Sequence, residues 1–236
     1  NHTTHTQVAY LARVAAATGE AAYRAACVRG LEFMLASQYP NGGFPQWWPK
    51  AGTIAKRITF NDGVMMGIMN VLKDAADVAP HFAWLDAAMR ARASEAVARG
   101  TDCLVRAQVR AERGPTGWGQ QHDEKTLETV GARTFEPPCV SPADTTEIVR
   151  FLMRVERPAP EIRRALEAAV RLEASVAVAL ESELDDALEA LALAGATGGA
   201  DIARRRVGAP TWALLYVIEP RRVVVVALVR SRPKSM

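Results

Sequence analysis

The sequence predicts an all-α protein built from paired antiparallel helices, followed by a short C-terminal β-hairpin. Apolar residues recur at helical spacing through most of the first 180 residues, and Gly-, Pro- and Asn-containing loops separate the helical stretches. Strand-like composition occurs only near the C-terminal end. The 236 residues, 49% of them hydrophobic, are enough for a globular domain with a sizeable core.

Two amphipathic helices open the chain, and a long loop from Gln38 to Thr59 follows them. The third helix begins at Asn61-Asp62, and Pro80 ends it. A polar loop after the fourth helix delivers Trp118 to Glu124. The expected helices cover Thr4 to Ala17, Glu20 to Ala36, Gly63 to Val78, Trp84 to Val109, a helix capped by Asp144 that runs through Val155, and Glu161 to about Leu180.

The composition changes beyond about Ala177. Ser182 to Leu193 is rich in Ala, Leu, Glu and Asp, and a basic run at Arg204 to Arg206 is interpreted as a solvated surface. Trp212 to Ile218 and Val223 to Val229 have the composition of two strands joined by a turn. We therefore divide the chain into a helical domain, 1–177, and a divergent tail, 178–236, that holds a helix and then the hairpin.

Charge and cysteine content restrict the function classes. A net charge of +3 tolerates a polyanionic ligand but does not by itself indicate nucleic acid. Cys27, Cys103 and Cys139 have neither zinc-ligand nor redox-pair spacing, so buried thiols are the simplest interpretation.

The sequence shows no signal peptide and no apolar run long enough to cross a membrane, which leaves two alternatives, a cytosolic protein or one whose targeting segment has been removed.

Three loop motifs carry the functional information. Each places an aromatic ring near a carboxylate or amide, a composition typical of sites that stack sugars and hold a hard cation. They therefore predict an acidic polysaccharide as the ligand. The motifs are Asn41 to Pro49, Ile58 to Asp62 and Trp118 to Glu124.

Each candidate residue also has a structural interpretation. Asp62 is either a Ca²⁺ ligand or a helix N-cap. Asp123 either contacts a cation or substrate or has no functional role, although its Trp-containing loop gives a carboxylate less structural reason to be there. We expect one of Trp47 and Trp48 to pack inward and the other to stack on a sugar. His122 is interpreted as a hydrogen-bonding residue without a catalytic role.

The same motifs, in order and spacing, resemble those of pectate lyases of polysaccharide lyase family 10, and the resemblance runs from Asn1 to about Val170. It implies an α/α toroid, a secreted or periplasmic location and Ca²⁺-assisted β-elimination of polygalacturonate. In the implied mechanism, Ca²⁺ held by Asp62 and Asp123 binds the uronate carboxylate and acidifies the adjacent C5 proton.

Four residues are predicted to contact substrate, namely Trp47, Trp48, Trp118 and Arg133, the last because its guanidinium suits a carboxylate. The expected partner is a polygalacturonate or pectin oligosaccharide, without nucleic acid or membrane, and the protein is expected to be a monomer.

The tail departs from the family pattern. The resembling enzymes use as base an arginine in a segment reading roughly Pro-x-Trp-Ala-Arg-Phe-Tyr, and the nearest counterpart here, Pro210 to Tyr216, has Leu214 at that position. Leucine cannot take a proton, so no intact catalytic residue is found. Three alternatives remain: a pectate lyase whose tail has been replaced or misread, a non-catalytic acidic-glycan binding protein, and a plain helical scaffold.

Overall fold

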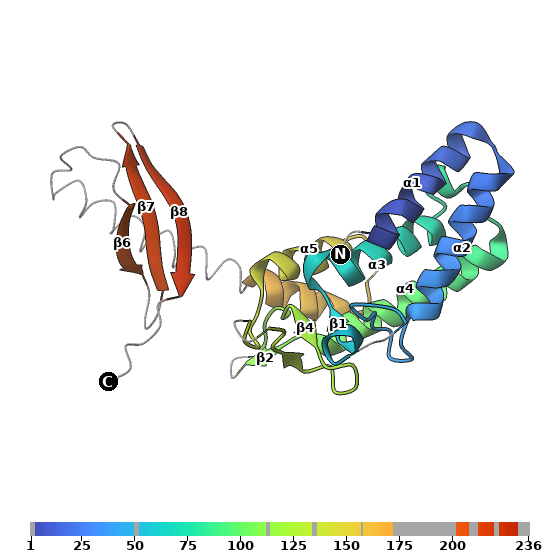
Figure 1. Cartoon of the computed structure of the whole chain (residues 1–236). Coiled ribbons are helices and arrows are strands. Elements are labelled where there is room, and N and C mark those ends of the chain that lie inside the picture. Colours follow the sequence, from blue (N-terminus) through green and yellow to red (C-terminus); the bar gives the residue numbers. More distant parts are fainter. Residues whose placement is uncertain are drawn as a thin grey trace. The chain divides into compact units, whose positions relative to one another are not determined.

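The computed structural model describes residues 3–49, 52–111, 114–133, 136–156, 158–171, 202–207, 212–219 and 222–230. Its contacts divide the chain into two units, Asn1–Val170 and Arg171–Met236, which are treated separately below (Figure 1). The predicted boundary at Ala177 and the stretch rich in Ala, Leu, Glu and Asp from Ser182 to Leu193 lie outside the described residues, so the helix predicted for the tail stays a prediction.

The first unit is helical, as predicted, and its helices form packed pairs. In Figure 1, α1 and α2 lie side by side, and α3 packs along α4. No helix within the described residues is long and apolar enough to cross a membrane. The helices are α1 (Thr3–Thr18), α2 (Ala21–Ser37), α3 (Val64–Ala76), α4 (Ala87–Ala107), α5 (Pro142–Leu152) and a further helical segment over 160–171; three 3-10 turns are η1 (Ile54–Lys56), η2 (Asn61–Gly63) and η3 (Pro80–Phe82).

Two predicted helix caps are wrong. The N-cap of α5 is Ser141, whose Oγ accepts a hydrogen bond from the backbone N–H of Asp144 at 3.4 Å, so Asp144 lies inside the first turn. Pro142, which suits a first helical position, fixes that start. Helix α3 is preceded by Gly63 rather than by a capping Asp62, because Asp62 has left-handed backbone angles, φ 56° and ψ 22°.

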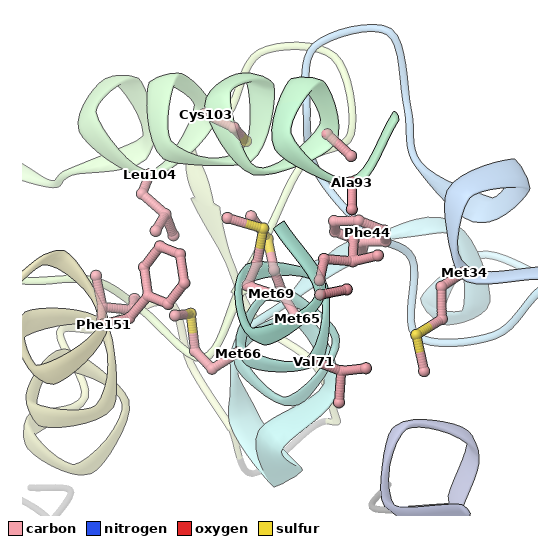
Figure 2. Packing of buried hydrophobic residues seen from close by; sticks show 14 of the residues in the cluster. Met34, Phe44, Met65, Met66, Met69, Val71, Ala93, Cys103, Leu104 and Phe151 are labelled. Atoms are coloured by element: carbon pink, nitrogen blue, oxygen red, sulfur yellow. The ribbon is translucent and has the colours of Figure 1, made fainter. Parts of the chain in front are cut away.

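The core lies between α3 and its neighbours. Figure 2 shows Met65 and Met69 on the side of α3 that faces α4, whereas Met66 points toward Phe151 of α5. An added Cβ on Gly100 would overlap the Met69 side chain, so α4 approaches α3 closely at this glycine. Unbranched methionines fill such irregular spaces well.

A small antiparallel sheet joins segments that the sequence predicted as loops. Strands β1 (Ile58–Thr59), β4 (Gln121–His122) and β5 (Thr129–Val130) pair in the order β1-β4-β5, and Pro45 forms an isolated bridge to Ile58. A separate pair consists of β2 (Arg110–Ala111) and β3 (Gly114–Pro115). The β1-β4-β5 sheet brings the three motifs together.

The second unit contains an antiparallel sheet of β6 (Ile202–Val207), β7 (Trp212–Glu219) and β8 (Arg222–Arg230), in that order. Strands β7 and β8 confirm the predicted hairpin. Strand β6 was not predicted, because its Arg204 to Arg206 run has no strand-like alternation. Leu214 lies in β7, where its Cα pairs with those of Arg205 and Leu228.

Candidate functional site

The three motifs, distant in sequence, meet at the paired strands β1 and β4. Thr59 is opposite Gln121, and the Gln120 carbonyl accepts the backbone N–H of Phe60 at 2.9 Å. The first motif reaches the third through Asn41, whose Nδ2 donates to the Glu124 carbonyl at 2.9 Å. One framework therefore holds all three candidate loops.

The opening residues of the first motif anchor the loop rather than face a ligand. Gly42 has a φ of 92°, and a Cβ at this position would overlap the Arg99 carbonyl of α4. Gln38 Nε2 donates both to the Gly42 carbonyl at 3.0 Å and to the Ala96 carbonyl of α4 at 2.8 Å. The loop is thus fastened to α4 before it reaches its tryptophans.

Trp47 and Trp48 remain candidates for sugar stacking. Their side of the loop is ordered, because Gln46 N–H donates to the Arg57 carbonyl and Trp47 N–H to the Ala55 carbonyl, both at 3.1 Å. Trp47 is 54% exposed and Trp48 36% exposed, so the expectation that one of them packs inward is wrong. Exposed, anchored indoles of this kind can stack on a ligand ring.

Trp118 cannot stack on a sugar as predicted. Its side chain is completely buried, and its indole N–H donates to the Leu104 carbonyl at 2.7 Å. Its backbone N–H donates to Thr145 Oγ1 of α5 at 3.0 Å. Trp118 therefore joins α4 to α5 in the core, and we withdraw it from the substrate-binding residues.

Asp62 lies near Asp144, a carboxylate that the sequence analysis interpreted only as a helix cap. Burial raises the pKa of Asp144, and the nearby negative charges of Asp62 and Glu147 raise it further, while the Ser141 hydroxyl opposes the shift. The contribution of the Asp62 charge to this shift means that the two carboxylates lie near each other. The sequence signal for Asp144 was ambiguous, because an acidic residue in a first helical turn also interacts favourably with the helix dipole.

Asp123 occupies a different environment. Its Oδ1 accepts the backbone N–H groups of Lys125 and Thr126 at 2.8 and 2.9 Å, and these bonds lower its pKa. Strands β1 and β4 are antiparallel, with Ile58 opposite His122. Asp123 directly follows His122 and therefore lies at the end of the pair where β1 begins. Asp62 comes after Thr59 and therefore follows the end of the pair where β1 ends. Asp62 and Asp123 thus follow opposite ends of the β1–β4 pair, and their predicted sharing of Ca²⁺ stays a prediction.

The described residues therefore do not form a complete metal site. Among them, no three His, Cys, Asp or Glu side chains come together as potential metal ligands. Because Ca²⁺ takes six to eight oxygen ligands, neither Asp62 nor Asp123 has a full shell from this part of the protein. Asp62 and Asp144 form a described carboxylate pair that could contribute to cation binding, and the predicted cation role of Asp123 stays a prediction.

Basic residues of the motifs have defined contacts. Lys56 Nζ lies 3.2 Å from Glu124 Oε1, and burial together with Glu124 raises the pKa of Tyr39 to about 12. Arg57 donates to the Gly131 carbonyl, which ties β1 to the loop that carries Arg133. Arg133 is largely exposed, and its Nη1 is 3.9 Å from Glu136 Oε1, so its predicted substrate contact stays a prediction.

His122 is a structural residue in the described sheet. Its Nε2 accepts the Gly119 N–H at 3.1 Å, so Nδ1 carries the proton that is donated to the Leu127 carbonyl at 2.8 Å. Burial lowers the pKa of the ring, and the Phe60 ring packs against it at 5.0 Å between centroids. Both ring nitrogens are occupied by backbone groups, which agrees with the non-catalytic interpretation.

Comparison with known proteins shows similarity to polysaccharide lyases. One similar solved structure is a family 10 polysaccharide lyase from Cellvibrio cellulosa, with 31% identity, a TM-score of 0.68, and coverage of 71% of this chain and 52% of that chain. Another is an aspartate-to-alanine mutant of the family 10 lyase from the same organism in complex with trigalaturonic acid, also 31% identical, with a TM-score of 0.69 and coverage of 71% and 53%.

The chain thus spans about half the length of these solved structures. No curated protein matches it. Similarity to these lyases supports the predicted α/α toroid class. The family model described as pectic acid lyase matches residues 1–224, which extends beyond the expected limit near Val170. A match over most of the sequence, together with 31% identity to a solved member, shows that the chain belongs to the pectic acid lyase family.

Proposed function

We propose that this protein is a pectate lyase that cleaves polygalacturonate by β-elimination. The observation that carries the proposal is the convergence of the three motifs on β1 and β4 in a member of the pectic acid lyase family. The trigalaturonic acid complex of the Cellvibrio cellulosa mutant supports an acidic oligosaccharide as the ligand class. In this reaction a base removes the C5 proton beside the uronate carboxylate, and the C4 oxygen leaves.

Calcium dependence is part of the proposal. The donor chemistry at Asp62 and Asp144 suits a hard cation, but these two carboxylates would leave coordination positions for substrate and water oxygens. A bound Ca²⁺ would neutralise charge that develops on the uronate. Asp123, on the other end of the β1–β4 pair, would act on a different part of the sugar chain.

The substrate contacts expected from the protein are of two kinds. Trp47 and Trp48 would supply ring faces, and Arg133 would supply a guanidinium for a uronate carboxylate. Arg133 follows β5 and the tryptophans precede β1, and β1 and β5 are the two outer strands of the same small sheet. An extended oligosaccharide suits contacts spaced in this way better than a compact ligand does.

The first experiment measures the ultraviolet absorbance of unsaturated uronide released from polygalacturonate, with Ca²⁺ and with a chelator. We expect Asp62→Asn to reduce the rate at least about tenfold, because a carboxylate charge is lost where the cation is proposed. Asp102→Asn is a matched control, because this exposed carboxylate pairs with Arg106 on α4. Absence of release by the folded native chain would reject the catalytic proposal.

Asp123→Asn tests the second carboxylate without dismantling its loop. Asparagine keeps an Oδ1 that can accept the Lys125 and Thr126 N–H groups, so thermal stability should change little. We expect Ca²⁺-dependent binding of trigalacturonate to weaken. If binding is the same with Ca²⁺ and with chelator in both the native chain and the variant, Asp123 has no cation-linked role.

A non-catalytic acidic-glycan binding protein is the alternative, and Leu214 favours it because leucine cannot act as a base. Leu214→Arg separates the two functions. If Leu214 occupies the base position, the variant should gain elimination activity while the native chain binds trigalacturonate without releasing unsaturated product. No gain in a variant that still binds would show that Leu214 does not occupy that position.

A further inference from the structure

A cavity outside the carboxylate pair has a composition suited to a different ligand group. It has a volume of about 360 Å³ and lies between the start of α1, the end of α2, the tryptophan loop and the start of α3. Phe33, Trp47 and Trp48 form aromatic walls, and all three are partly exposed. The volume is within the range of sites for small ligands.

The polar part of this cavity is built from buried groups. Gln46 Oε1 is buried and has no hydrogen-bond partner in the described part of the protein. Ser37 Oγ donates to the Met34 carbonyl at 2.7 Å, which leaves its oxygen able to accept. A ligand that brings hydroxyl donors would satisfy these acceptors, and a buried acceptor without a donor is otherwise unfavourable.

The cavity is held in shape by its surroundings. Gln46 and Trp47 are fixed through backbone bonds to Arg57 and Ala55, and the His5 ring packs directly against Gly67 of α3, where an added Cβ would overlap it. An ordered cavity requires little rearrangement on binding, which favours affinity. Aromatic walls and hydroxyl-accepting groups in a fixed frame are the features of a sugar subsite.

Its charge distinguishes it from a uronate site. None of the described residues that line it is Asp, Glu, Lys or Arg, and His5 is the only titratable one among them. A galacturonate carboxylate would be expected to pair with Arg or Lys.

We propose that this cavity binds an uncharged pyranose unit. Its ring would pack between the indoles, and one of its hydroxyls would donate to Gln46 Oε1. The inference rests on the proposed function, because it gives a pectin-directed protein a subsite for the units of the polymer that carry no charge. The unit could come from two sources, a methyl-esterified galacturonate or a neutral sugar, which share this chemistry.

Calorimetric titration with trigalacturonate, its methyl ester and galactotriose tests the proposal. We expect Trp47→Ala to weaken binding of the uncharged ligands about tenfold, as truncation of an aromatic anchor commonly does, and to weaken trigalacturonate as well, because Trp47 is also a proposed contact of the acidic chain. Gln46→Leu removes the hydroxyl acceptor at similar size and should weaken only the uncharged ligands, while trigalacturonate affinity stays the same. Tyr10→Ala is the matched control, because Tyr10 is 66% exposed on α1 and does not line this cavity.

The outcomes also distinguish methyl-esterified galacturonate from a neutral sugar, and they distinguish failure of the subsite from failure of the proposed lyase function. An effect on the methyl ester alone identifies esterified galacturonate, and an effect on both uncharged ligands identifies a general neutral-sugar subsite. If neither uncharged ligand binds the native chain, or if Gln46→Leu weakens trigalacturonate as much as its ester, the inference is wrong. If trigalacturonate is neither bound nor cleaved while galactotriose binds through Trp47, the proposed lyase function fails and the subsite remains.

Discussion

At the scale of single residues, His122 links the small sheet to pH. Its folded pKa is lowered from the ordinary value of 6.5, so protonation is easier in the unfolded chain. The stability that the neutral ring contributes is therefore present above about pH 6.5 and is lost as the pH falls below it. Urea unfolding between pH 8 and pH 5 should show this loss, with a slope from this one group of at most about 1.4 kcal/mol per pH unit.

The control for this pH dependence is His122→Asn, which removes the titrating ring. It should be less stable than the native chain at pH 8 but should show a shallower slope below about pH 6.5. Equal slopes in the two proteins would mean that His122 does not supply the pH dependence. Other titrating groups contribute equally to both curves, so the difference between the slopes isolates the imidazole.

The residue types of the motifs could be recognised from the sequence, but their surroundings could not. Trp118 and Trp47 both occur in Gly-containing loops, yet one is buried against α4 and α5 and the other is exposed. The difference arises from helices distant in sequence, which local pattern does not report. Asp144 was missed for the same reason, since its proximity to Asp62 arises only when α5 packs against α3, the helix that follows Asp62.

At the scale of elements, the long helices were predictable because their apolar period extends over several turns, as for Leu85, Met89, Ala96 and Leu104 in and before α4. The strands β1, β4 and β5 were not predictable, since two residues cannot show an alternating pattern. Their pairing is set by side-chain and turn contacts across the site. Sequence reasoning therefore found the helical scaffold and the site loops, but not the sheet that joins them.

The attachment of the 38–43 loop to α4 makes a prediction at this scale. Gly42→Ala places a Cβ on the Arg99 carbonyl and also imposes an unfavourable φ of 92°, so we expect a loss of about 2–4 kcal/mol in the free energy of unfolding. Gly52→Ala is the matched control, because Gly52 has a φ of 80° but nothing within 4 Å of the added Cβ. Denaturant unfolding should give a clearly smaller loss for Gly52→Ala, and equal losses would show that α4 does not constrain the loop.

At the scale of the whole molecule, the contacts of the chain divide it into two units, Asn1–Val170 and Arg171–Met236. Within the described residues, the buried cluster of the first unit draws on its whole length, from Val8 to Ala169. The Cys27 and Cys103 thiols lie inside it, and burial raises their pKa values to about 11 and about 12. Thiols in this environment are mostly protonated and unreactive at neutral pH.

A fragment of residues 1–171 should therefore fold by itself. We expect the thermal midpoint of its helical circular dichroism to lie within about 4 °C of the midpoint of the full chain, roughly 1 kcal/mol for a domain of this size. A fragment ending at residue 156 is the contrasting case, because it lacks the buried Ala165 and Ala169 and leaves Gln108 without its bond to the Ala165 carbonyl. Cooperative unfolding of the longer fragment and loss of cooperativity in the shorter one would place the end of the folding unit after the 160–171 helix. If the longer fragment also fails to unfold cooperatively, residues after 171 contribute to the core, and the effects of Leu214→Arg must then be separated from changes in stability.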